Sequence, residues 1–327
     1  MGRQPGLILL ALSVIVAALL TLTLRGPMRP PRTHAPDPVS AEEKKPYLSP
    51  ETKTPVAVPP LFPTKFTPLA PGDEGITLAS VDIGEILKTD LDASQLAPID
   101  DPESVPASSS AAPADDEPVI GVVIDGKPRA YPLALLSGHW VVNDHVDGRS
   151  VTVLYDPIAG AAAACWSSID DEPVTIAATE FFYRGNAVFV ELAAGCFLLA
   201  PTGRFITGEL AGRALNTLPY RRESWADWKK RYPETRVVAA NAPDTDPFEH
   251  VEDAIRATPE LVGNITEDPL GWVVGYEDED GSLETKTVTG PDDENARILL
   301  PGGSFARQVV CRSFAWRQLI SEVKKTP

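Results

Sequence analysis

The stretch Val119–Gly160, VIGVVIDGKPRAYPLALLSGHWVVNDHVDGRSVTVLYDPIAG, decides the fold class and contains the candidate site. Asp125-Gly126 and Asp147-Gly148 supply the positive φ angles that type I′ turns require. Each dipeptide is flanked by runs rich in Val, Ile and Tyr, the residues that favour strands. The stretch therefore predicts β-hairpins.

The same signals continue outward along the chain. Arg184-Gly185-Asn186 and Pro201-Thr202-Gly203 each separate two short apolar runs and predict two further hairpins. Ser224 can cap a helix WADWKKRY, and Ser313 can cap a helix FAWRQLISEVKK with an apolar stripe. We therefore expect an α+β fold that consists mainly of antiparallel β-hairpins and sheets with a few packed helices.

The N-terminus predicts a membrane segment. An uncharged apolar run extends from Leu7 to Leu24, and as a helix it would span about 27 Å, close to the thickness of the bilayer hydrocarbon. A cleaved signal peptide is the competing interpretation, but no Ala-x-Ala site follows the run. Residues 1–26 are thus predicted to be a transmembrane anchor or signal segment. Arg25, Arg29 and Arg32 oppose the usual charge bias, although an extracytoplasmic domain remains the simplest topology.

A proline-rich segment follows the apolar run. Between Pro27 and Pro71, 13 of 45 residues are proline, which cannot donate ladder hydrogen bonds or continue a helix. We therefore expect residues 27–95 to form a tether that includes a short amphipathic piece, Ile76 to Leu91. Residues 96–327, about 230 in number, can form one extracytoplasmic globular domain.

Charge restricts the partners. The formal net charge is −17, and the acidic residues gather in loop-like clusters. Nucleic acid requires a basic surface, so nucleic acid is excluded as a partner, and anionic lipid surfaces are disfavoured. The expected partner is the membrane, through the N-terminal helix, together with a ligand or protein that the sequence does not identify.

Three cysteines, Cys165, Cys196 and Cys311, are too few and too widely spaced for a zinc site. Each has apolar or small neighbours, as buried structural cysteines usually have. One disulfide among them is possible outside the cytoplasm. A catalytic cysteine would need a nearby base, and the chain has only four histidines.

The polar residues of the opening stretch form the candidate site. If Trp140–Val142 is a strand and Asn143-Asp144 begins a turn, His139, Asp144, His145 and Asp156 can converge. Such a set suits zinc, copper or non-haem iron, and the same residues can act as acid and base. The alternative is that Asn143-Asp144 only closes a turn while His139 is a half-buried, hydrogen-bonded residue.

Several motifs resemble the bacterial domain of unknown function 3179. The resemblance covers about Leu96 to Ala240. The segments that carry it are Leu96–Pro102, Pro118–Val122, Gly126, Arg129–Leu133, His139, Asn143-Asp144, Tyr155–Gly160, Thr207–Gly212 and Trp225–Thr235. It adds Arg129 and Tyr131 to the candidate site residues His139, Asn143, Asp144 and Asp156.

The chain departs from the family where chemistry is expected. The family segment C-P-L-C-G is Asp156-Pro157-Ile158-Ala159-Gly160 here, so both cysteines are absent, and the glutamate after the family histidine is Trp140. The resemblance therefore implies the fold more strongly than a reaction. A hard cation could still bind Asp156 beside His139, whereas a dithiolate site is excluded.

Three functions remain open. The first is a membrane-tethered binding or interaction domain with a degenerate family site. The second is a metal-binding protein or metalloenzyme that uses His139, Asp144, His145 and Asp156. The third is an acid/base enzyme without a metal, which has the least support because no nucleophile signature is present.

Overall fold

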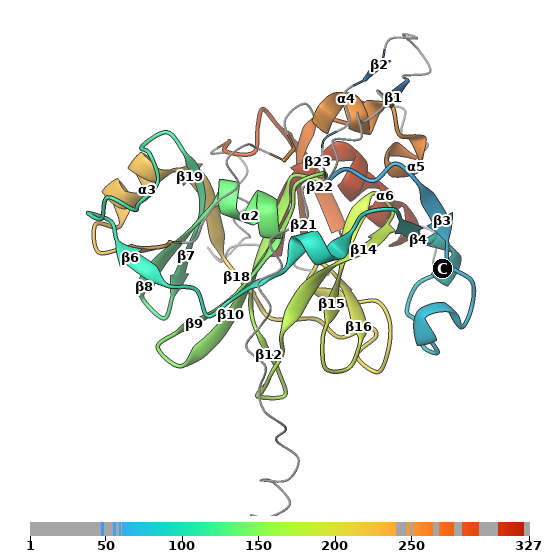
Figure 1. Cartoon of the computed structure of the whole chain (residues 1–327), viewed down its shortest axis with the longest axis horizontal. Coiled ribbons are helices and arrows are strands. Elements are labelled where there is room, and N and C mark those ends of the chain that lie inside the picture. The colour runs from blue at the N-terminus through green and yellow to red at the C-terminus, as the bar shows by residue number, and fades with distance from the viewer. Residues whose placement is uncertain are drawn as a thin grey trace, which may run out of the picture. The chain divides into compact units, whose positions relative to one another are not determined.

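The computed structural model in Figure 1 describes residues 47–48, 55–56, 59, 61–239, 247–248, 251–263, 268–277, 283–293 and 307–323. All of them belong to one unit, Pro46–Pro327. The predicted anchor, residues 1–26, and most of the predicted tether up to residue 60 lie outside the described residues. Among the described helices, none is both long and apolar enough to cross a bilayer.

The central sheet contains the second predicted hairpin. Its strand order is β18-β11-β10-β9-β5, antiparallel except that β5 runs parallel to β9. Asp147 and Gly148, with φ of 52° and 79°, form the predicted turn between β9 and β10. The strands are β5 (Ile99–Asp100), β9 (Val141–Val146), β10 (Arg149–Asp156), β11 (Ala161–Trp166) and β18 (Thr217–Leu218).

The first predicted hairpin belongs to a second sheet, with strand order β19-β7-β8-β20-β6. Asp125 and Gly126 adopt φ of 47° and 82° at its turn, as a type I′ geometry requires. The strands are β6 (Ser104–Pro106), β7 (Pro118–Ile124), β8 (Lys127–Pro132), β19 (Tyr220–Ser224) and β20 (Arg236–Val238). Only the β8–β20 pair in this sheet is parallel.

A six-stranded sheet, in the order β17-β16-β15-β14-β4-β3, contains the other two predicted hairpins. Their turns lie at residues 184–185 and 200–203, close to the expected positions. The strands are β3 (Phe66–Pro68), β4 (Ile86–Thr89), β14 (Ile176–Tyr183), β15 (Asn186–Glu191), β16 (Cys196–Leu199) and β17 (Arg204–Phe205).

The tether prediction is wrong for residues 61–95. Strand β4 pairs with β14, and β3 pairs with β4, so this part of the proline-rich segment joins the six-stranded sheet. Ile86 is fully buried there. Proline is tolerated at this place because Pro68 lies in the edge strand β3. The folded unit therefore begins well before residue 96.

The remaining described strands form smaller sheets. A three-stranded antiparallel sheet has the order β22-β21-β23. The strands are β21 (Trp272–Glu277), β22 (Leu283–Val288) and β23 (Arg307–Arg312). Two further pairs join β1 (Tyr47–Leu48) to β2 (Pro55–Val56) and β12 (Ser168–Ile169) to β13 (Glu172–Pro173).

Short helices connect and cover these sheets. They are α2 (Leu133–His139), α3 (Trp225–Arg231), α4 (Val251–Arg256), α5 (Pro259–Val262) and α6 (Ser313–Val323), with 3₁₀ turns η1 (Asp73–Gly75), η2 (Ile83–Glu85) and η3 (Ala93–Leu96). Both capped helices of the sequence analysis, α3 and α6, are present. Ser224 accepts a hydrogen bond from the Asp227 N–H, and Trp225, Trp228 and Trp316 are buried. The fold is therefore mainly antiparallel β with a few packed helices, as expected.

Both faces of the central sheet are buried. Val142, Val151 and Val153 pack in one cluster with Ile120 and other side chains of the β7–β8 hairpin. On the opposite face, the side chains Val141, Leu154 and Cys165 pack with residues of the six-stranded sheet such as Phe182, Phe189 and Leu198. In Figure 1, β9 and β10 accordingly lie between the β7–β8 hairpin and the strands β14 to β16.

Helix α3 approaches the second sheet at a glycine. A Cβ added to Gly121 in β7 would lie 2.3 Å from Cε3 of Trp228. The Trp228 indole N–H also donates to Thr235 Oγ1 over 2.9 Å, which fixes the ring over the strand. Glycine at position 121 thus lets α3 lie directly on β7.

All three cysteines lie in the described part of the chain, and each is buried outside any disulfide. Burial, followed by the charge of Asp156, raises the pKa of the Cys311 thiol. Cys311 is therefore a structural thiol, as its apolar neighbours indicated, and not an activated nucleophile.

Candidate functional site

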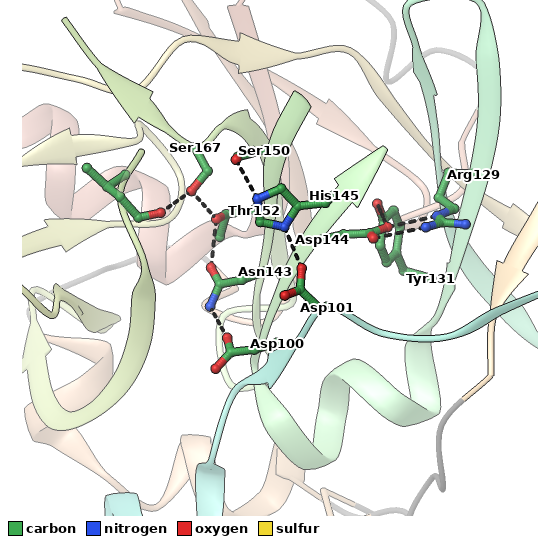
Figure 2. A network of polar contacts seen from close by, with 11 residues as sticks. Asp100, Asp101, Arg129, Tyr131, Asn143, Asp144, His145, Ser150, Thr152 and Ser167 are labelled. Carbon is green, nitrogen blue, oxygen red and sulfur yellow. Dashed lines mark hydrogen bonds and ion pairs between the residues drawn. The ribbon is translucent and has the colours of Figure 1, made fainter. Parts of the chain in front are cut away.

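Arg129, Tyr131 and Asp144 meet between two sheets. Arg129 and Tyr131 lie on β8, and Asp144 faces them from β9 (Figure 2). Arg129 Nε donates to Asp144 Oδ2 over 2.7 Å and Nη2 donates to Oδ1 over 2.9 Å, so the ion pair is bidentate. The Tyr131 hydroxyl donates to Asp144 Oδ2 over 2.9 Å. Arg129 also contacts the Ser104 hydroxyl.

This ion pair is buried and internally satisfied. The Arg129 and Asp144 side chains are 9% and 2% exposed. Burial opposes the charge on Arg129, but hydrogen bonds and attraction from Asp144 outweigh it, so the Arg129 pKa is raised. Burial and the Asp144 charge raise the Tyr131 pKa as well, which keeps the phenol protonated. The three side chains form a clamp between the second and central sheets.

Asn143 bonds on the other face of β9. Its Nδ2 donates to Asp100 Oδ1 over 2.8 Å and to the Ile176 carbonyl over 2.9 Å. Thr152 Oγ1 lies 2.8 Å from Asn143 Oδ1, as Figure 2 shows. Asn143 therefore connects the central sheet to β14 in the six-stranded sheet.

The prediction that Asn143-Asp144 begins a turn is wrong. Both residues lie within β9, while Leu133–His139 forms α2 and Trp140, at φ 63°, ends that helix. Alternation along β9 sends the two neighbouring side chains to opposite faces. Asn143 and Asp144 consequently belong to two separate networks.

The two histidines of the predicted site, His139 and His145, have separate hydrogen-bond partners. His139 is half-buried at the end of α2, and its Nδ1 lies 2.8 Å from the Ala97 carbonyl oxygen. His145 is exposed, with Nδ1 at 2.5 Å from Asp101 Oδ1 and Nε2 at 2.8 Å from Ser150 Oγ. Both histidine side chains are thus hydrogen-bonded within the fold.

Asp156 supports the turn that ends β10. Oδ1 accepts the N–H groups of Ile158 and Ala159 over 3.0 Å and 2.9 Å, and Oδ2 accepts the Ala187 N–H over 2.7 Å. The side chain is fully buried. Burial raises its pKa to about 6, although the three N–H donors act in the opposite direction. Asp156 thus stabilises the 156–160 turn and attaches it to β15.

The predicted metal set does not assemble. Within the part of the chain that the structure describes, no group of three or more His, Cys, Asp or Glu side chains is arranged to hold a metal ion. Asp144 binds Arg129, Asp156 binds backbone N–H groups, and each histidine is hydrogen-bonded to a different partner. His139, Asp144, His145 and Asp156 are therefore not a common ligand set, which corrects the sequence-based prediction.

A cavity of about 480 Å³ lies beside the 156–160 turn. None of the six predicted site residues lines this cavity. Its lining combines apolar side chains with two arginines and two acidic residues. The lining residues are Pro118, Leu133, Ser137, Tyr155, Pro157, Gly160, Arg222, Phe248, Val251, Glu252, Asp253, Trp272 and Arg312.

Sequence reasoning did not identify Arg222, Trp272 and Arg312. They lie on β19, β21 and β23, far apart in the chain. One signal was available, because Arg221 and Arg222 are neighbours in a strand and must point to opposite faces. One of the two arginines therefore had to face inward.

Comparison with known proteins gives one family. The model of a family described as protein of unknown function, DUF3179, matches residues 95–288, more than half of the chain. The match extends beyond the segment up to Ala240 on which the sequence resemblance rested, and it includes the cavity residues Arg222 and Trp272. No curated protein and no solved structure matches the chain.

Asp144→Ala should strongly destabilise the fold. It leaves the Arg129 charge buried without its partner, which should lower the free energy of unfolding by about 3–5 kcal/mol in urea denaturation. Asp115→Ala is the matched control, because Asp115 is 72% exposed in its pair with Lys229 and should cost less than about 1 kcal/mol. Equal losses in the two variants would show that the clamp does not hold the sheets together.

Asp156 should make the fold less stable as pH rises. The folded protein keeps the Asp156 proton up to about pH 6, whereas the unfolded chain releases it near the ordinary pKa of 3.8. Between these values the folded state binds more protons, so the free energy of unfolding falls with rising pH, by about 3 kcal/mol for this shift.

This dependence is measurable as the difference between the wild type and Asp156→Asn, unfolded in urea on both sides of the window. The variant lacks the titration, and other carboxyl groups cancel in the comparison. The ¹³C shift of the Asp156 carboxyl should titrate with a midpoint near 6. A midpoint at or below 3.8 would mean that the three N–H bonds outweigh burial.

Proposed function

The chain belongs to the DUF3179 family, whose function is unknown, and we propose that it is a binding protein whose ligand occupies the cavity beside the 156–160 turn. One observation carries this proposal. The polar side chains of the predicted site are engaged in bonds within the fold, whereas the cavity beside the 156–160 turn is lined by other residues.

The location of the cavity supports the same conclusion. Tyr155, Pro157 and Gly160 belong both to the cavity lining and to the segment that corresponds to the family's C-P-L-C-G motif. In this chain Asp156 replaces the first cysteine and directs its oxygens to backbone N–H groups. The turn therefore contributes a wall to the cavity, without a nucleophile or a thiolate.

The size and lining of the cavity suit a small organic molecule. About 480 Å³ is within the roughly 300–1,000 Å³ that ligand pockets usually occupy. Leu133, Phe248, Val251 and Trp272 contribute apolar side chains to the lining. The charged lining residues are Arg222, Glu252, Asp253 and Arg312. Apolar side chains next to charged groups suit a small molecule that has both an apolar and a polar part.

We also propose that the domain is tethered outside the cytoplasm by residues 1–26 and the proline-rich residues that follow. The uncharged run from Leu7 to Leu24 has the length of a bilayer span. Phe62 is already buried in the core of the folded unit, so the proposed tether ends before it.

A ligand in the cavity should change the environment of Trp272. We expect some members of a library of neutral and charged fragments to shift the Trp272 indole ¹H–¹⁵N signal of the full-length chain. Ser137→Phe places a ring in the cavity from α2 and should abolish these shifts. Ser110→Phe, at an exposed position, is the control that should bind normally. The proposal fails if no fragment shifts the signal or if binding survives in Ser137→Phe.

The tether predicts both membrane association and external exposure. The full chain should sediment with membranes after an alkaline wash, and deletion of residues 1–26 should release it. Ser110→Cys should react with a membrane-impermeant maleimide on intact cells, whereas the wild type should stay unlabelled because its three thiols are buried. Labelling only after permeabilisation would place the domain in the cytoplasm.

A further inference from the structure

Two arginines of the cavity have N–H groups that lack a hydrogen-bond partner in the described part of the chain. Arg312 ends β23 and its side chain is 8% exposed, and Arg222 lies in β19 with 18% exposed. In both residues Nε and Nη1 are buried and make no hydrogen bond with any residue that the structure describes. A guanidinium remains charged at any physiological pH and carries five donors.

Such donors are costly to leave unsatisfied. A buried charged group without a hydrogen-bond partner costs more than a neutral one, and buried polar groups in folded proteins almost always have a partner. Two incompletely paired guanidinium groups in one cavity therefore indicate an acceptor that binds there. Oxygen atoms of a carboxylate or phosphate match the planar fork of arginine.

The acidic residues near Arg222 and Arg312 pair with only some of their N–H groups. Glu252 Oε1 lies 2.9 Å from Arg312 Nη2. Asp292 Oδ1 lies 3.3 Å from Arg222 Nε, an ion pair without hydrogen-bond geometry. Both carboxylates are more than half exposed, at 60% and 53%. They weaken the positive potential of the cavity but form no hydrogen bond with Nε or Nη1 of either arginine.

Trp272 positions both guanidinium groups. The Cζ atoms of Arg312 and Arg222 lie 5.0 Å and 5.7 Å from the Trp272 ring centre. The ring itself is held against Gly160, where an added Cβ would lie 2.5 Å from Cη2 of Trp272. Gly160 also has φ of 65°, which favours glycine. The 156–160 turn thus fixes the indole that orients the arginines.

We propose, building on the binding function inferred above, that this cavity binds a small organic anion. Its carboxylate or phosphate group is held by Arg222 and Arg312. Its apolar part contacts Phe248, Leu133 and Val251, which line the same cavity. The net charge of −17 disfavours polyanions, so a compact ligand with one anionic group fits best.

Benzoate, phenyl phosphate and benzamide are suitable probes, titrated into the full-length chain at constant ionic strength with the Trp272 indole signal as readout. Benzamide has the shape of benzoate without its charge. We expect benzoate or phenyl phosphate to bind at least tenfold more tightly than benzamide, and the tighter of the two identifies the anionic group.

Matched variants locate the anion. Arg312→Gln and Arg222→Gln should each weaken anion binding at least tenfold and leave benzamide unchanged. Arg312→Lys keeps the positive charge but not the planar guanidinium, so its affinity for the anion should lie between those of the wild type and Arg312→Gln. It also tests the proposal if Arg312→Gln does not fold. Arg256→Gln is the control, since Arg256 lies on α4 with 52% exposure and does not line the cavity. Glu252→Gln should tighten anion binding, because it removes the competing carboxylate.

The outcomes separate the two proposals. If benzamide binds as tightly as benzoate and the arginine variants have no effect, the anion assignment is wrong while the cavity still binds ligands. If neither anion shifts Trp272 at millimolar concentration, the anion assignment is also wrong, and the fragment library then decides whether the cavity binds anything. Loss of anion binding in Arg256→Gln as well would show that binding is a non-specific effect of charge.

Discussion

Burial of both faces of the central sheet is the constraint on which the structure depends. Strand β9 carries Asp144 toward one neighbouring sheet and Asn143 toward the other, and each polar side chain has partners in the sheet that it faces. Since a buried polar group without partners is costly, these bonds fix the register of three sheets at once. A slip of β9 by one residue would exchange the two faces and break both networks.

The same constraint explains why the predicted site is a set of structural contacts. Arg129 and Asp144 satisfy one another, and Asp156 satisfies three backbone N–H groups of a turn and a neighbouring strand. A carboxylate accepts such bonds more strongly than a thiol, so aspartate at position 156 suits an anchoring role. The turn that it supports then places Gly160 against Trp272, and through that ring it affects the cavity.

Buried charge is therefore used in two ways in this molecule. In the clamp, the Arg129 guanidinium has a bidentate carboxylate partner and the ion pair is complete. In the cavity, Arg222 and Arg312 each have buried donors that bond to none of the described residues. The first arrangement has the character of a structural element, and the second has the character of a site prepared for an acceptor. This contrast between the two arrangements is the reason for assigning an anionic ligand to the cavity.

The sequence alone determined most local structure. Asp-Gly and Gly-containing turns located the hairpins, because few other residues adopt positive φ, and serine caps located α3 and α6. Family motifs gave the scaffold around Arg129–Asp156. Tertiary structure decided which neighbours meet. Asn143 and Asp144 face opposite sides of the sheet because side chains alternate along β9. Strands β3 and β4 belong to a large sheet because β4 pairs with the distant β14. Arg222, Trp272 and Arg312 line one cavity although they lie on three different strands. Local signals act over a few residues, whereas these contacts arise only when separate strands pack.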